Sequence, residues 1–192
     1  MKKVIIYTEG AAKGNPGNGG YGVVMIFGPY RKEFSDGFRL TTNNRMELLS
    51  VIVGLERLKK EKTFVTVYSD SKYVVDSIEK KWLFSWEKKN FSKKKNPDLW
   101  IRFLKAYRKH CVSFVWVKGH SNISENERCD ELAVKAAESD LRGYEISLEQ
   151  YILREQKART QYRYDVQSIS EKYPDVDAYL MAIKGKLGDF ER

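Results

Sequence analysis

The chain has 192 residues, of which 42% are hydrophobic, and this is enough for one domain with a full core. Its formal net charge is +9, an excess of basic residues that favours a polyanionic partner. No stretch is long enough to span a membrane, the apolar run near the N-terminus is too short for a signal peptide, and the two cysteines lack metal-ligand spacing. We therefore expect a soluble cytoplasmic protein with no membrane partner.

The first stretch combines a short apolar run, a carboxylate and many glycines. Val4 to Tyr7 predicts a buried strand that ends before Glu9. Residues 10–20 are rich in glycine and predict an open loop in which a ligand can approach the backbone closely. An acid beside such a loop fits a metal or phosphate site, and it fits an ordinary hairpin connection equally well.

The next residues predict an antiparallel meander followed by a helix. Residues 21–27 form one strand of the meander, and residues 31–40 form one or two further short strands. From about Arg45 to Lys60, apolar residues recur at helical spacing. Glu47 lies three residues after Asn44, so spacing alone assigns Glu47 to a capping box.

A second buried strand, Phe64 to Tyr68, is also followed by an acid, Asp70. The preceding helix would act as a crossover that makes this strand parallel to the first. Glu9 and Asp70 would then meet at the edge of the sheet where active sites tend to lie. Two acids at that edge repel each other, so we expect a cation between them.

Residues 80–98 interleave lysines with aromatic residues, between helices predicted over 72–80 and 99–108. Lysines neutralise phosphates and aromatic rings stack on bases, so this pattern favours a contact with nucleic acid. The alternative is a solvated helix pair whose aromatic residues belong to the core. We expect Trp82 and Phe84 to be core residues in either case.

The last predicted strand covers residues 113–117 and is followed by His120. In its glycine-flanked loop His120 would be fit for proton transfer, or it would be an ordinary surface histidine. A helix is predicted over 125–138, with Asp130 beside its buried stripe.

Ser124 and Glu127 have the spacing of a capping box at the start of that helix.

Beyond residue 139 the pattern changes. We expect residues 140–192 to form a partly helical C-terminal extension of unknown role, which is a candidate contact for protein partners.

Together these motifs resemble the type 1 ribonuclease H family, the bacterial ribonuclease HI family, over about residues 3–138. The motifs stand in the family's order and spacing, at residues 14–22, 41–48, 68–71, 117–120 and 125–130. The resemblance implies an α/β, ribonuclease H-like fold, in which a five-stranded mixed sheet of an antiparallel meander plus parallel strands is flanked by helices. The catalytic domain would cover residues 1–139, with a basic protrusion over about 80–98.

The resemblance further implies an endoribonuclease that hydrolyses the RNA strand of RNA–DNA hybrids with two Mg²⁺ ions, for which Mn²⁺ can substitute. Its metal ligands would be Glu9, Glu47, Asp70 and Asp130, and His120 would be a catalytic residue that assists proton transfer or product release. Hard oxygen ligands without cysteine suit Mg²⁺. The residues implied to bind the hybrid are Asn15, Thr42, Asn43, Asn44, Lys72, Trp82, Trp86, Lys88, Lys89, Lys93, Lys94, Lys95 and Asn96.

One position departs from the family pattern, because Glu9 stands where the family has aspartate. Glutamate moves the carboxylate outward by about 1.5 Å, one carbon–carbon bond. A displacement of about 1 Å can cost roughly a hundredfold in rate, so we expect a weakened enzyme or one that favours Mn²⁺. The sequence is compatible with a natural and with an engineered Glu9.

Two other classes of protein remain open. The first is a module that binds RNA–DNA hybrid or double-stranded RNA, keeps the fold and has lost turnover. The second is another nuclease or an integrase of the same superfold, against which the run of residues 41–47 and the basic protrusion argue.

Overall fold

The computed structural model describes residues 3–119 and 123–139. Five strands form one sheet in the order β3-β2-β1-β4-β5. The elements are β1 (Val4–Gly14), β2 (Gly17–Phe27), β3 (Tyr30–Thr41), α1 (Asn43–Glu56), β4 (Phe64–Ser69), α2 (Lys72–Glu79), α3 (Trp82–Lys88), α4 (Pro97–Tyr107), β5 (Cys111–Trp116) and α5 (Ser124–Glu138).

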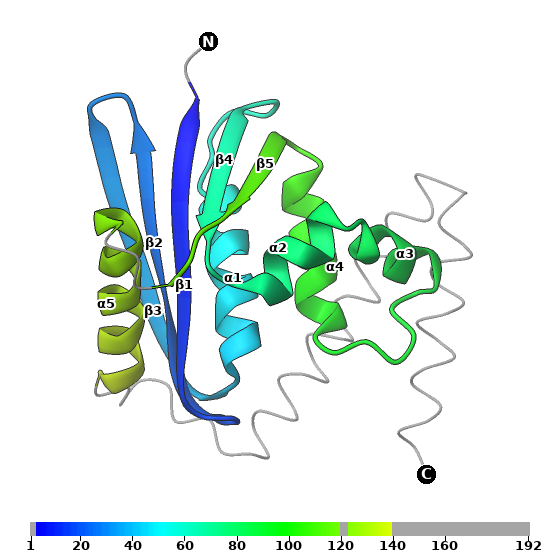
Figure 1. The fold of residues 1–192 in the computed structure, drawn as a ribbon, viewed down its shortest axis with the longest axis horizontal. Helices are drawn as coiled ribbons and strands as arrows, with labels where there is room; N and C mark the ends of the chain where they lie inside the picture. Colours follow the sequence, from blue (N-terminus) through cyan, green and yellow to red (C-terminus); the bar gives the residue numbers. More distant parts are fainter. Residues whose placement is uncertain (1–2, 120–122, 140–192) are drawn as a thin grey trace.

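The sheet is mixed. β1, β2 and β3 form an antiparallel meander, whereas β4 pairs in parallel with both β1 and β5. Helix α5 packs on β1, β2 and β3, and α1 packs on β1, β2 and α4 (Figure 1). The predicted five-stranded mixed sheet flanked by helices is therefore confirmed.

The first hairpin differs from the prediction. β1 does not end before Glu9 but continues to Gly14, and β2 begins at Gly17, so the predicted glycine loop is wrong. The glycines allow helices to lie close to the strands. A Cβ on Gly10 would collide with the backbone of Glu47, and one on Gly22 would collide with the backbone of Cys129. Close packing, rather than an open loop, requires glycine here.

Two further elements complete the first half of the chain. Residues 30–41 form the single strand β3, which is the one-strand alternative of the prediction. Helix α1 begins at Asn43, and its N-cap is Thr42, whose Oγ1 accepts a hydrogen bond of 3.4 Å from the Arg45 N–H. The capping box predicted for Asn44 and Glu47 is therefore wrong, which frees Glu47 for another role.

The capping box predicted for Ser124 and Glu127 is wrong as well. Ile123 is the N-cap of α5 and provides no side-chain cap, and the Ser124 hydroxyl donates to the neighbouring Glu125 carboxylate at 2.6 Å. Spacing alone found the start of the helix but not the bonds that satisfy it.

The core extends under the lysine-rich segment. Trp100 of α4 is fully buried, and its ring contacts the ring of Trp86 with centroids 5.7 Å apart. Phe84 packs against Tyr107, as predicted for a core residue, but the Trp82 side chain is 46% exposed, so its assignment to the core is wrong. Within the described ranges no helix is long and apolar enough to cross a membrane.

Candidate active site

The site forms where the parallel part of the sheet ends. β1 and β4 pair in parallel from Val4 and Val65 to Thr8 and Ser69. β4 ends there while β1 continues, so Glu9 and the residue after β4, Asp70, come to the same edge of the sheet, as expected from the crossover.

A third carboxylate comes from α1. The first turns of this helix lie against Gly10, so Glu47 is placed beside the edge where Glu9 and Asp70 meet. One oxygen from each of these three residues lies within 4.8 Å of the others. Asp130 of α5 lines a pocket with Glu9 and Asp70, together with two further α5 residues, Asn126 and Glu127. The four predicted carboxylates therefore converge. Glu9 comes from β1, Glu47 from α1 and Asp130 from α5, and Asp70 follows the end of β4.

The electrostatics of this cluster disfavour its charged form. The Glu9 and Glu47 side chains are buried, with only 4% and 5% exposure. Burial, and after it the charges of Glu47 and Asp70, raises the pKa of Glu9 to about 10. Burial and the charge of Asp70 raise the pKa of Glu47 well above its ordinary value. A cation between these carboxylates would offset both shifts, because it stabilises their charged forms.

The residues present fit a hard divalent cation. Oε1 of Glu9 and Oε2 of Glu47 are buried and have no hydrogen-bond partner in the described part of the chain. Buried polar atoms without partners are rare, and carboxylate oxygens are the ligands that Mg²⁺ prefers. Glu9, Glu47, Asp70 and Asp130 could together hold such an ion.

Neighbouring groups fix the orientation of the carboxylates. The Asn43 amide donates a hydrogen bond of 3.3 Å to Oε1 of Glu47, and the backbone N–H of Gly10 donates to the same carboxylate. The indole N–H of Trp116 donates to the Asp70 carbonyl oxygen at 2.9 Å. These bonds hold two elements against the site before any ligand arrives.

Sequence reasoning missed two residues of this site, Asn126 and Trp116. The side chain of Asn126 hydrogen-bonds Glu9. The signal for Asn126 was its position four residues before Asp130, which places both on one helix face. For Trp116 there was no sequence signal, because its contact to Asp70 depends on the register of β4 and β5.

The residues predicted to bind nucleic acid lie on several elements. Asn15 is exposed at the turn of the first hairpin, and Asn43 and Asn44 are exposed at the start of α1, which Thr42 caps. Asn96 is half-buried and already engaged. Its amide donates to the Tyr73 hydroxyl at 3.2 Å, and its oxygen accepts from Arg45 at 3.3 Å.

The predicted basic protrusion presents lysines on a packed base. All seven of its lysines are exposed, namely Lys80, Lys81, Lys88, Lys89, Lys93, Lys94 and Lys95. The Lys94 ammonium lies over the Trp86 ring, 4.9 Å from its centroid, and Lys72 lies over Trp116 at 5.0 Å. Trp86 therefore packs against the core beneath the protrusion, whereas Trp82 is exposed and has the Lys80 ammonium over its ring, 4.9 Å from the centroid. His120 lies outside the described residues.

Comparison with known proteins assigns the family. The RNase H family model matches residues 1–138. The chain belongs to the ribonuclease H family. The ribonuclease H of Desulforamulus reducens is 57% identical over 142 residues, covering 71% of this chain and 89% of that protein. The ribonuclease H of Syntrophus aciditrophicus is 56% identical over 142 residues, covering 71% of this chain and 82% of that protein.

Solved ribonuclease H structures share the fold. LC9-RNase H1, described as a type 1 RNase H with the type 2 active-site motif, matches with a TM-score of 0.65 and 26% identity, over 79% of this chain and 84% of that one. LC11-RNase H1, solved in complex with an RNA/DNA hybrid, matches with a TM-score of 0.53 and 30% identity, over 70% of this chain and 96% of that one. The predicted resemblance to type 1 ribonuclease H is thus confirmed.

Proposed function

We propose that this ribonuclease H hydrolyses the RNA strand of RNA–DNA hybrids with two divalent cations, Mg²⁺ or Mn²⁺. The observation that carries the proposal is the group of three carboxylates whose ligand atoms lie within 4.8 Å of one another. The burial of Glu9 and Glu47, each with an unpartnered oxygen, supports it. The relatives named ribonuclease H and the LC11-RNase H1 complex with an RNA/DNA hybrid support the choice of substrate.

Glu9, Glu47, Asp70 and Asp130 would hold the cations in this site. The chemistry that two such ions would supply when bound is a more acidic attacking water, a stabilised leaving oxygen and neutralised charge at phosphorus. The protein contributes orientation, because the Asn43 amide and the Gly10 N–H keep the Glu47 carboxylate directed at the cluster before substrate binds.

Substrate recognition would come from exposed groups around the acids. Asn15, Asn43 and Asn44 carry short amides that suit the reading of 2′-hydroxyls and base edges in the minor groove. The exposed lysines of the protrusion would contact phosphates of the DNA strand, and the exposed Trp82 ring offers a stacking surface. His120 would assist proton transfer or product release.

We further propose that Glu9 weakens catalysis. Its carboxylate extends one carbon–carbon bond, about 1.5 Å, beyond an aspartate on the same backbone. In the metal-free chain it hydrogen-bonds the Asp70 side chain, which adds to the rise in the pKa of Glu9. The rate should suffer more than binding of the hybrid, because only the rate requires placement of the carboxylate within about 0.5 Å. A catalytically impaired hybrid or double-stranded-RNA binding module is the alternative that Glu9 favours.

The test is cleavage of a hybrid labelled on its RNA strand, in Mg²⁺ and in Mn²⁺, by the chain and by Glu9→Asp. We expect slow cleavage that Glu9→Asp accelerates roughly a hundredfold in Mg²⁺, with hybrid affinity unchanged. Glu131→Asp, the same change at an exposed position of α5 outside the pocket, should alter neither quantity. If neither form cuts in either ion while both bind the hybrid, the binding module is the correct assignment.

We also propose that residues 1–139 are the catalytic domain and that residues 140–192, which lie outside the described residues, are an extension with another role. The family model ends at residue 138, which supports this division. Cleavage by a chain that ends at residue 139 tests it, because loss of activity on truncation would contradict it.

A reducing cytoplasm is the compartment we propose, since Cys111 and Cys129 are both unpaired.

A further inference from the structure

The pocket at the end of the sheet contains one amide among its acids. Asn126 lies in the first turn of α5 and is only 4% exposed. It lines the pocket together with Glu9, Asp70, Glu127 and Asp130. It is the amide among these five residues, so it can donate one hydrogen bond and accept another at the same time.

The two ends of the Asn126 amide are in different situations. Its N–H side hydrogen-bonds the Glu9 carboxylate and lowers the pKa of that group against the larger effect of burial. Its Oδ1 is buried and has no partner within the described ranges. A buried amide oxygen without a partner is unfavourable unless water or a ligand supplies a donor. The unpartnered atom is therefore an observation that points to a ligand in the pocket.

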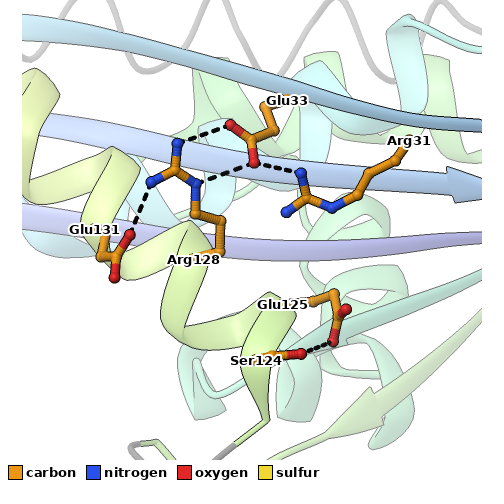
Figure 2. A network of polar contacts seen from close by, with 6 residues as sticks. All are labelled: Arg31, Glu33, Ser124, Glu125, Arg128 and Glu131. Atoms are coloured by element: carbon orange, nitrogen blue, oxygen red, sulfur yellow. Dashed lines mark hydrogen bonds and ion pairs between the residues drawn. The ribbon is translucent and has the colours of Figure 1, made fainter.

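Contacts of α5 with two strands hold the backbone near Asn126 in place. Gly22 has no Cβ, so the backbone of Cys129 lies directly on β2 one turn after Asn126. The Arg128 guanidinium forms two hydrogen bonds of 3.0 Å to the Glu33 carboxylate of β3, which fixes the rotation of α5 about its axis (Figure 2). Close packing on one side and a bidentate ion pair on the other keep the Asn126 side chain directed at the pocket.

We propose that Asn126 is a positioning residue, which holds the long side chain of Glu9 through its amide N–H and offers Oδ1 to the hydration shell of the cation. This inference rests on the proposed function. Glutamate has one more rotatable bond than aspartate, so a carboxylate at the end of Glu9 needs an anchor that a shorter side chain does not need. Mg²⁺ keeps several of its waters in protein sites, and an amide oxygen is a suitable acceptor for one of them.

The test asks whether the effects of substitutions at residues 126 and 9 on Mg²⁺ affinity are coupled. The affinity is measured by calorimetry without substrate. We compare the chain, Asn126→Ala, Glu9→Asp and the double variant. We expect Asn126→Ala to weaken Mg²⁺ binding about tenfold when residue 9 is glutamate and only about twofold after Glu9→Asp, because the shorter side chain no longer reaches the amide and only the contact of Oδ1 with a bound water is lost. Asn18→Ala, which removes an exposed amide on β2, is the matched control and should leave Mg²⁺ affinity unchanged.

A merely structural role predicts a different result. It would lower the urea midpoint of unfolding and weaken Mg²⁺ binding equally in both backgrounds, and that outcome overturns the inference. Unchanged Mg²⁺ affinity in both backgrounds overturns it too. Asn126→Leu, which keeps the volume without any polar atom, repeats the comparison if Asn126→Ala fails to fold.

Failure of the proposed function has its own signature. If the chain and Glu9→Asp both bind no Mg²⁺ and cut no hybrid, the metal site itself is wrong. If both bind Mg²⁺ and cleave while Asn126→Ala shows no coupling to residue 9, the proposed function stands and only the role of Asn126 is rejected.

Discussion

Two glutamates near α5 have opposite electrostatic surroundings. Glu33 of β3 accepts hydrogen bonds from Arg128 and Arg31, which lower its pKa to about 2. Glu9 of β1 is buried beside Glu47 and Asp70, and its pKa rises to about 10. The same side chain is therefore held as an anion at one position and as a neutral acid at the other.

This difference in pKa shows which of the two clusters is complete, meaning that its charges are paired within the chain. The charges of Arg31, Glu33, Arg128 and Glu131 pair with one another inside the chain, and they join β3 to α5 (Figure 2). In the described part of the chain no basic side chain forms an ion pair with the acids around Glu9, so a ligand is the source we propose for their opposite charge. The first cluster joins two elements of the fold, whereas the second is the candidate metal site.

The largest expected effect comes from removing one charge of the incomplete cluster. Glu47→Gln should lower the rate of cleavage roughly 10³-fold, because one metal ligand is lost. The same variant should be more stable than the parent in metal-free buffer at pH 7 to 8. The folded-state pKa of Glu47 is raised, so folding loses free energy as pH rises above about 4.5, the ordinary value, and glutamine avoids that loss.

Initial rates on a labelled hybrid and urea unfolding in the presence of a chelator measure these two effects of Glu47→Gln. Glu131→Gln is the control, because Glu131 belongs to the complete cluster and is outside the pocket. A variant that loses activity together with stability would contradict the comparison, because Glu47 would then support the fold.

Three lysines of the protrusion extend the comparison, because they are positive charges that pair with no carboxylate in the described part of the chain. Lys93, Lys94 and Lys95 are exposed and form no ion pair with the described part of the chain. Replacing all three by alanine should weaken hybrid binding roughly tenfold near 0.1 M salt and lower the slope of log affinity against log salt by about 2. Fluorescence anisotropy at several salt concentrations measures both, and an unchanged slope would place these lysines away from the hybrid.

A third measurement tests the neutral state of Glu9. With a pKa of about 10, Glu9 keeps its proton at pH 7 to 8 in the metal-free chain, and a bound cation must displace it. Mg²⁺ binding should therefore release at least one proton, because Glu47 with its raised pKa can release another, and affinity should rise with pH up to about 10. Calorimetry in two buffers of different ionisation enthalpy measures the release. Glu33→Gln should still show it, because Glu33 is already ionised, and equal heats in both buffers would contradict it.

Much of the fold was accessible from the sequence. The apolar runs at Val4 to Tyr7 and Phe64 to Tyr68 identified the two parallel strands, and helical spacing identified α1 and α5. The failures share one cause, which is that local patterns carry no information on tertiary contacts. Glycines were assigned to a loop because their neighbours in space, the backbones of α1 and α5, are distant in sequence.

The candidate site was predictable in its acids but not in their surroundings. Glu9, Glu47 and Asp70 meet as the motifs implied. The raised pKa values depend on burial, and the roles of Asn126 and Trp116 depend on helix rotation and strand register. Aromatic residues of the protrusion also divided differently than expected, because Trp82 starts α3 on its exposed side.

The smallest expected effect tests the complete cluster itself. Glu33→Gln removes the carboxylate that Arg31 and Arg128 hold, and the urea midpoint at pH 7 should fall by about 0.3 M, since partly exposed ion pairs contribute little. The pKa of Glu33 is lowered to about 2, so its contribution is fully present above about 4.5 and is lost as pH falls towards 2. The difference between parent and Glu33→Gln should therefore shrink over that range. A difference that persists at pH 2 would mean that Glu33 acts through packing and not through its charge, and the contrast with Glu9 would then lose its electrostatic basis.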